Sequence, residues 1–140
     1  MKELLALVDE DTAAFNRLMG AMRMPKSSPE QIEERDAAIE AATLYAGEVP
    51  LRTMKTAVKA FPLLRRMAEE GNPNSVSDAG VGALAARSAV LGAQLNVKIN
   101  ASGLQNRDDA SRLLAEAEAV AADAIKAEED ILNIVNGKIN

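Results

Sequence analysis

The chain has 140 residues, and 16 Lys and Arg against 21 Asp and Glu give a net charge of −5. One domain is expected at this length, and the negative charge argues against nucleic-acid binding, which needs a basic surface. The sequence contains no Cys and no His, which excludes disulfides, thiol nucleophiles, imidazole chemistry and the usual zinc sites. It also lacks an apolar run of membrane-spanning length and the pattern of a secretory signal, so a cytoplasmic location is expected.

Helices are the expected elements, because Ala, Leu, Glu, Lys and Arg dominate and β-branched runs are scarce. The first helix would cover residues 2–23, and a second would run from Pro29 to Gly47 with Ser28 as its N-cap. Helical periodicity predicts that one apolar stripe of the first helix is buried. That stripe consists of Leu4, Val8, Phe15, Leu18, Met19 and Met22.

Prolines divide the middle of the chain. Pro50 would kink the second helix or begin a new one over residues 51–70, and Pro62 should bend that segment. The sequence from Ser75 to Asp78 resembles a capping box and would open a helix that ends near residue 100, followed by a last helix over 107–136. The predicted fold is all-α, an antiparallel bundle of four to five helices in one domain, residues 1–140, that forms a homodimer or higher homo-oligomer.

The predicted helix that follows Ser75 is rich in small residues. Gly80, Gly82 and Gly92 lie inside it, and each glycine costs a helix about 1 kcal/mol relative to alanine. Glycines in such a helix are expected where another backbone approaches closely.

Asp11 is the first candidate catalytic residue. It lies between Val8 and Phe15 on the predicted apolar stripe of the first helix. A carboxyl group desolvated there favours its protonated form unless a cation pairs with it, and can act as a general acid or base. The alternative is an ion pair between helices or a contact with a backbone donor. Asp9 and Asn16 form a second polar face with Thr12, for which a solvated surface is the alternative.

The second candidate cluster lies at the predicted start of the small-residue helix. Asn72, Asn74, Ser77 and Asp78 bring short polar side chains close to free helix N–H groups. That combination favours an anion or a developing negative charge, and makes Asp78 the second candidate catalytic residue. Helix capping alone is the alternative.

Asn96 and Asn100 are candidate binding residues late in the same predicted helix. Asn96 follows Asp78 by about five turns, so the two side chains point the same way but lie about 27 Å apart. They cannot share one reacting centre within a subunit, unless a long ligand lies along the helix or a two-fold partner brings opposite ends together. Amide hydrogen bonds across a helix interface are the alternative.

A basic stripe is the last feature that stands out. Its members share one face of the predicted helix over 51–70. They are Arg52, Lys55, Lys59 and Arg66. The stripe is a candidate for holding a polycarboxylate tail, and the alternatives are a solvated face or contact with an acidic neighbouring helix.

The chain as a whole resembles the formiminotetrahydrofolate cyclodeaminase / methenyltetrahydrofolate cyclohydrolase family. The resemblance is carried in order by VDEDTAAFN (8–16), MPK (24–26), EVPL (48–51), GNPNSVSDAGV (71–81) and GAQLNVKIN (92–100). Family members have an earlier helix with a glycine-rich opening segment that this sequence lacks, so an N-terminally truncated domain is expected.

The resemblance implies an all-helical, dimer-forming folate enzyme that uses no metal or redox cofactor. Cyclodeaminase members close 5-formimidoyltetrahydrofolate to 5,10-methenyltetrahydrofolate and release ammonia, and cyclohydrolase members interconvert the methenyl and 10-formyl forms. We expect an ammonia-lyase in which Asp11 or Asp78 protonates the leaving nitrogen. Asn16, Asn74 and Asn96 are expected to bind the pterin or the amidine. The alternatives are a cyclohydrolase and a non-catalytic helical interaction protein.

Overall fold

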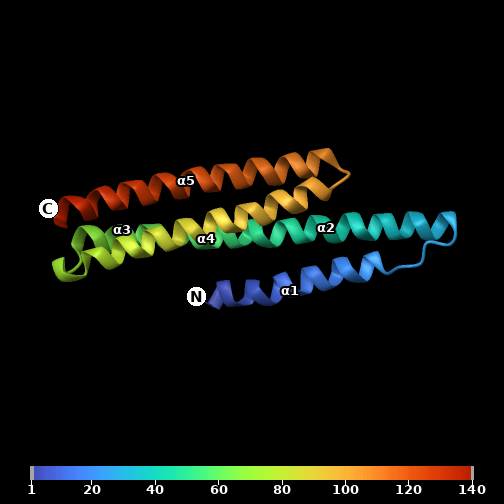
Figure 1. The fold of residues 1–140 in the computed structure, drawn as a ribbon, viewed down its shortest axis with the longest axis horizontal. Coiled ribbons are helices and arrows are strands. Elements are labelled where there is room, and N and C mark those ends of the chain that lie inside the picture. Colours follow the sequence, from blue (N-terminus) through green and yellow to red (C-terminus); the bar gives the residue numbers. More distant parts are fainter. Residues whose placement is uncertain (1, 140) are drawn as a thin grey trace.

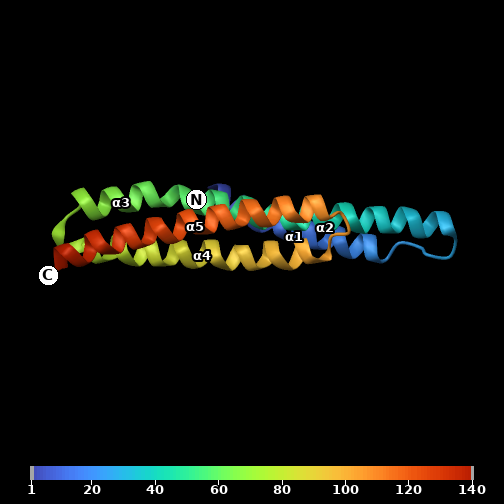
Figure 2. The same cartoon turned by 90° about the horizontal axis from the view of Figure 1, so that it is seen from above.

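The computed structural model describes residues 2–139, which form a long antiparallel helical bundle (Figure 1). The α-helices are α1 (Lys2–Met22), α2 (Pro29–Ala57), α3 (Phe61–Glu70), α4 (Val76–Gly103) and α5 (Arg107–Ile139), and the 3₁₀ turns are η1 (Val58–Ala60) and η2 (Pro73–Ser75). Successive long helices run in opposite directions, and α3 continues the course of α2 (Figures 1 and 2). The predicted all-α antiparallel bundle is confirmed. None of the helices in the described residues has the length and apolarity that crossing a bilayer requires.

Helix α2 begins where the sequence predicts but ends later. The Ser28 side chain accepts a hydrogen bond from the Gln31 backbone N–H at 3.2 Å, with Pro29 in the first turn. The predicted end at Gly47 is wrong, because α2 passes through Pro50 as far as Ala57. Pro50 and its two neighbours are buried, so tertiary packing offsets the one helix hydrogen bond that the proline removes.

The break in this long segment lies before Pro62 instead. Turn η1 begins at Val58, and α3 begins at Phe61 with Pro62 in its first turn. A proline ring clashes with the carbonyl four residues earlier, which here belongs to Val58. The predicted bend is therefore present, and it lies in the turn that this clash disrupts.

Helix α4 is the centre of the bundle and packs extensively on α2 and on α5. The main core contains its side chains Val90 and Val97, with Met54 of α2 and Leu113 of α5, all fully buried. Gly47 of α2 permits this packing, because a Cβ there would lie 2.9 Å from Leu113. The core fixes how α2, α4 and α5 are placed relative to one another.

Helix α1 is attached differently and packs mainly on α2. It buries Leu7 and Ala14 against Val49 in a small separate cluster. The predicted burial of the larger stripe is wrong for most of its members, since Val8 is 63% exposed and Phe15 61% exposed, while Leu18 and Met19 are half-buried. The buried face of α1 consists of Leu7, Ala14 and Ala21, and the stripe of larger apolar side chains lies beside that face.

A buried ion pair joins α4 to α5. Arg87 donates a hydrogen bond to Glu128 at 2.6 Å, and the Glu128 side chain is only 3% exposed. A buried carboxylate that loses its cation is strongly destabilising, because neither water nor a counter-charge replaces it.

We predict that Arg87→Met lowers the free energy of unfolding by about 3 kcal/mol, measured by urea denaturation. The double variant Arg87→Met with Glu128→Leu removes both charges and is expected to recover most of that loss. A single variant as stable as the unmodified chain would contradict this account of the α4–α5 contact.

Candidate functional site

A hollow of about 220 Å³ lies between α1, α2 and α4, and we call it the α1–α4 pocket. Two candidate residues from different parts of the sequence, Asp11 and Asn96, both line it. The complete lining is Leu4, Leu7, Val8 and Asp11 from α1, Pro50 and Thr53 from α2, and Ala93 and Asn96 from α4. The fold thus brings Asp11 of α1 close to Asn96 in the later part of α4, the helix rich in small residues.

The polar groups of the α1–α4 pocket offer both hydrogen-bond donors and acceptors. The Thr53 hydroxyl donates to the Val49 carbonyl at 3.2 Å, so its oxygen remains available as an acceptor. Asn96 adds an amide that can donate and accept, and Asp11 adds a carboxyl group that can exchange a proton. Together with the apolar lining residues, this set can hydrogen bond a ligand that carries both donors and acceptors.

The predicted desolvation of Asp11 is not met in the single chain. Asp11 is exposed, because the stripe on which it lies is exposed. No ion pair of Asp11 is found among residues 2–139. Asp9 and Asn16 are also exposed and lie outside the pocket lining. This position agrees with the solvated face that was the alternative for both residues.

The second predicted cluster lies at the other end of α4. Asn72 accepts a hydrogen bond from the Asn74 N–H at 3.0 Å, and the Ser75 hydroxyl donates to the Asn72 carbonyl at 3.1 Å. The predicted capping box is wrong, because Ser75 lies at the end of turn η2 and its side chain forms no cap hydrogen bond. Ser77 and Asp78 are exposed on the first turn of α4.

One chain therefore does not bring its two candidate acids together. Asp78 and Asn96 lie on one straight helix, about 27 Å apart, and Asn96 rather than Asp78 lines the pocket with Asp11. The side-chain amide of Asn100 donates to the Asn96 backbone carbonyl at 2.8 Å, within α4 rather than across an interface.

The basic stripe is paired with carboxylates. The pairs are Arg52–Glu10, Lys55–Glu116, Lys59–Glu3 at 3.0 Å and Arg66–Glu70 at 3.7 Å. The hydrogen bond from Lys55 lowers the pKa of the Glu116 carboxyl group, and a hydrogen bond from Arg112 lowers it further. Contact with acidic neighbours, the alternative for this stripe, describes three of the four pairs, and the fourth lies within α3.

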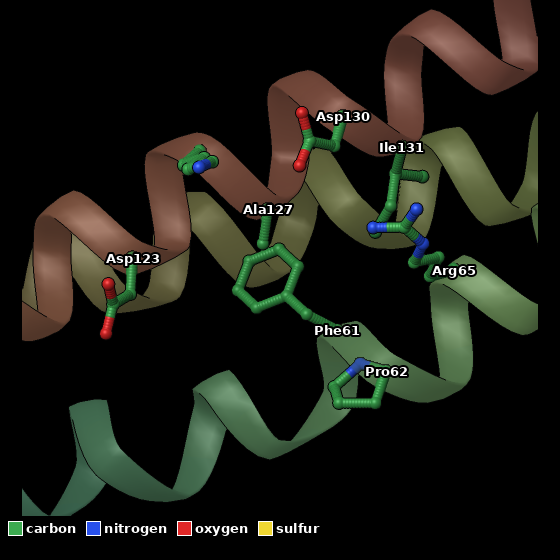
Figure 3. A pocket seen from close by; sticks show the side chains of 8 residues that line it. Phe61, Pro62, Arg65, Asp123, Ala127, Asp130 and Ile131 are labelled. Atoms are coloured by element: carbon green, nitrogen blue, oxygen red, sulfur yellow. The ribbon is translucent and has the colours of Figure 1, made fainter.

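A second hollow, of about 310 Å³, lies between α3 and α5 and was not predicted from the sequence. Phe61 and Pro62 face Ala127 and Ile131 across it, while Asp123 and Asp130 lie along α5 above them (Figure 3). Arg65 and Lys126 complete its lining. Its polar groups are all charged and include no amide or hydroxyl, so it offers a ligand ionic contacts in place of the amide and hydroxyl of the α1–α4 pocket.

We predict that Leu7→Ala loosens α1 without unfolding the rest of the bundle. Leu7 is 8% exposed and anchors α1 in its small cluster, so its truncation should cost about 2–3 kcal/mol. Hydrogen exchange of the α1 amides is expected to accelerate, while that of α4 and α5 stays unchanged. Leu5→Ala is the matched control, because Leu5 is 64% exposed. Equal protection of α1 in both variants would refute this anchoring role.

Comparison with known proteins gives a consistent result. Residues 1–119 match the family model described as formiminotransferase-cyclodeaminase. The chain is 37% identical over 139 residues to the methenyltetrahydrofolate cyclohydrolase of Methylorubrum extorquens, which covers 99% of this chain and 67% of that protein. It is 35% identical over 127 residues to the formimidoyltransferase-cyclodeaminase of Rattus norvegicus, covering 86% of this chain and 24% of that protein. It is 41% identical over 100 residues to the formimidoyltransferase-cyclodeaminase of Gallus gallus, covering 71% of this chain and 18% of that protein.

Proposed function

The chain belongs to the formiminotransferase-cyclodeaminase family, and on that premise we propose that it is an enzyme of folate one-carbon chemistry. The reaction we assign is cyclodeamination, in which 5-formimidoyltetrahydrofolate becomes 5,10-methenyltetrahydrofolate and ammonia is released. Such an enzyme is an ammonia-lyase. The proposal includes a cytoplasmic location and a homo-oligomeric assembly, with no metal, redox cofactor or nucleic-acid partner.

The α1–α4 pocket is the observation that carries this proposal. Asp11, Thr53 and Asn96 surround one hollow with apolar walls, which matches a ligand that combines a flat ring with an amidine. The Asn96 amide can hydrogen bond to the ring or to the formimidoyl group, and the Thr53 oxygen can accept from an N–H of either. Asp11 is then the group within reach that can move a proton.

The reaction requires proton transfer at two nitrogens. N10 of the folate attacks the formimidoyl carbon and forms the second carbon–nitrogen bond of the five-membered ring. The resulting tetrahedral intermediate passes the N10 proton to the exocyclic nitrogen, and that nitrogen takes up one more proton before it departs as ammonia. Asp11 would accept the first proton as a carboxylate and return it as a carboxylic acid.

Methenyltetrahydrofolate cyclohydrolase activity is the second candidate function. The Methylorubrum extorquens relative, of which this chain spans 67%, bears that name, whereas the chain spans a quarter or less of the rat and chicken proteins. Asp11 would then activate a water molecule that adds to the methenyl carbon, giving the 10-formyl product. Ammonia released from formimidoyl-folate favours the first function, and methenyl-folate consumed without ammonia favours the second.

We predict that Asp11→Asn lowers kcat/KM by about 10²–10⁴-fold, because an amide cannot exchange the proton. The rate is followed by absorbance of the methenyl product and by ammonia release. Asp36→Asn is the control, because Asp36 is an exposed carboxylate in α2 outside the pocket lining, and it should retain full activity. An Asp11→Asn variant within about twofold of the unmodified chain would remove Asp11 from the mechanism. An unmodified chain inactive in both reactions would overturn the proposed function.

A further inference from the structure

The second hollow, between α3 and α5, is separate from the α1–α4 pocket, and we call it the α3–α5 pocket. The two hollows share no lining residue. The α3–α5 pocket lies at the break between α2 and α3, where Phe61 and Pro62 begin α3. Across from this break α5 presents Ala127, whose side chain of one carbon leaves the space of about 310 Å³ open. The pocket therefore lies where a proline break meets a small residue.

The floor of the α3–α5 pocket is apolar and is held in place by the core. Phe61 is 5% exposed and Ile131 is 1% exposed, and both belong to the main core. Pro62 and Ala127 extend this apolar surface on its two sides. Pockets that bind small molecules are lined mainly by apolar side chains and measure roughly 300–1,000 Å³. The α3–α5 pocket falls within that range, and its floor suits an aliphatic chain.

Charged side chains surround this floor. Asp123, Ala127 and Asp130 are spaced by four and three residues, so they share one face of α5, and the two aspartates are about 10 Å apart along the helix. Asp123 lies at one end of the floor, and Arg65 approaches it from α3 at the other end (Figure 3). With Lys126, two cations and two carboxylates line the pocket, so the lining carries no net charge.

Three of these four charged groups have no ion-pair partner among the described residues. They are Asp123, Lys126 and Asp130. The fourth, Arg65, donates a hydrogen bond from its Nε to Glu69 at 2.8 Å. Its terminal amino groups form no hydrogen bond within residues 2–139. Glu69 raises the pKa of Arg65, and the Asp130 carboxylate adds a smaller contribution of the same sign. A carboxylate at one end of the floor and a guanidinium at the other are therefore open to a ligand.

We propose that the α3–α5 pocket binds an aliphatic ω-amino acid, a linear zwitterion with an ammonium group at one end and a carboxylate at the other. The ligand ammonium pairs with Asp123, and the ligand carboxylate accepts hydrogen bonds from Arg65. The methylene chain between them lies on the apolar floor. A lining without net charge favours a ligand without net charge, and the separation of the two ends favours a linear zwitterion over an α-amino acid, whose charges are adjacent.

Calorimetric titration with three matched compounds tests the class of ligand. On chains of equal length, 6-aminohexanoate carries both charges, hexylamine carries only the ammonium group, and hexanoate carries only the carboxylate. The unmodified chain is expected to bind 6-aminohexanoate at least about tenfold more tightly than either of the other two. Absence of binding up to about 10 mM 6-aminohexanoate, or equal affinity for hexylamine or hexanoate, would overturn the proposal.

The same pair of charges occurs in two sources, a free ω-amino acid and a protein whose last residue is lysine. In the second case the lysine ammonium group and the terminal carboxylate are the two ends of the zwitterion. Competition between 6-aminohexanoate and a short peptide that ends in lysine distinguishes these sources. Tighter binding of the peptide would assign the ligand to a protein C-terminus, and tighter binding of the free compound would assign it to a small molecule. Either result supports the same site.

Substitutions at the two ends of the floor locate the bound zwitterion. Asp123→Asn and Arg65→Gln are each expected to weaken binding of 6-aminohexanoate at least about tenfold, because each removes one charge contact. Glu129→Gln is the matched control, since Glu129 is an exposed carboxylate of the same helix outside the pocket lining, and it should bind as the unmodified chain does. Unchanged affinity in Asp123→Asn or in Arg65→Gln would contradict the assigned ends.

Filling the hollow tests the floor. Ala127→Leu places a larger side chain opposite Phe61 and is expected to abolish binding of 6-aminohexanoate, while circular dichroism shows an unchanged helical fold. Ala122→Leu is the control, because Ala122 is exposed on the same helix outside the pocket lining, and it should retain full affinity. A folded Ala127→Leu chain that binds the zwitterion with unchanged affinity would refute the site. None of these measurements involves folate, so their outcome is independent of the proposed function.

Discussion

The packing of α4 between α2 and α5 is the interaction on which the rest of the structure depends. Fully buried side chains such as Val90 and Val97 hold it there, together with the ion pair between Arg87 and Glu128. Because α4 is fixed along its length, the position of every residue on its surface is fixed as well. Asn96 therefore lies beside α1 and lines the α1–α4 pocket, and Asp78 lies in the first turn of α4, about 27 Å away along the helix.

Much of the fold was predictable because it depends on local chemistry. Composition indicates helices, and Ser28 followed by Pro29 marks the start of α2. The effect of each proline was not predictable, because Pro50 and Pro62 differ in tertiary surroundings rather than in local sequence. The orientation of α1 was missed for a related reason. Periodicity identifies an apolar stripe, but it cannot tell whether the stripe faces its own chain or another molecule.

The candidate site was likewise predictable where it depends on local sequence and not where it depends on tertiary packing. Residue type and helical position pointed to Asp11 and Asn96 separately, but only the fold brings them to one pocket. The local hydrogen bonds around Asn72 and Ser75 could not be derived, because turn η2 changes the geometry that the capping pattern assumes. Family membership makes folate the natural ligand to consider.

The central claim is that the folate site lies in the α1–α4 pocket. Calorimetric binding of 5-formyltetrahydrofolate, a stable folate with a one-carbon group on N5, tests it most directly. The account predicts one ligand per chain for the unmodified protein and at least about tenfold weaker binding to the Asn96→Ala variant, which lacks the amide that lines the pocket, a difference of about 1.4 kcal/mol. Equal affinity of the unmodified protein and the Asn96→Ala variant for this ligand would contradict it.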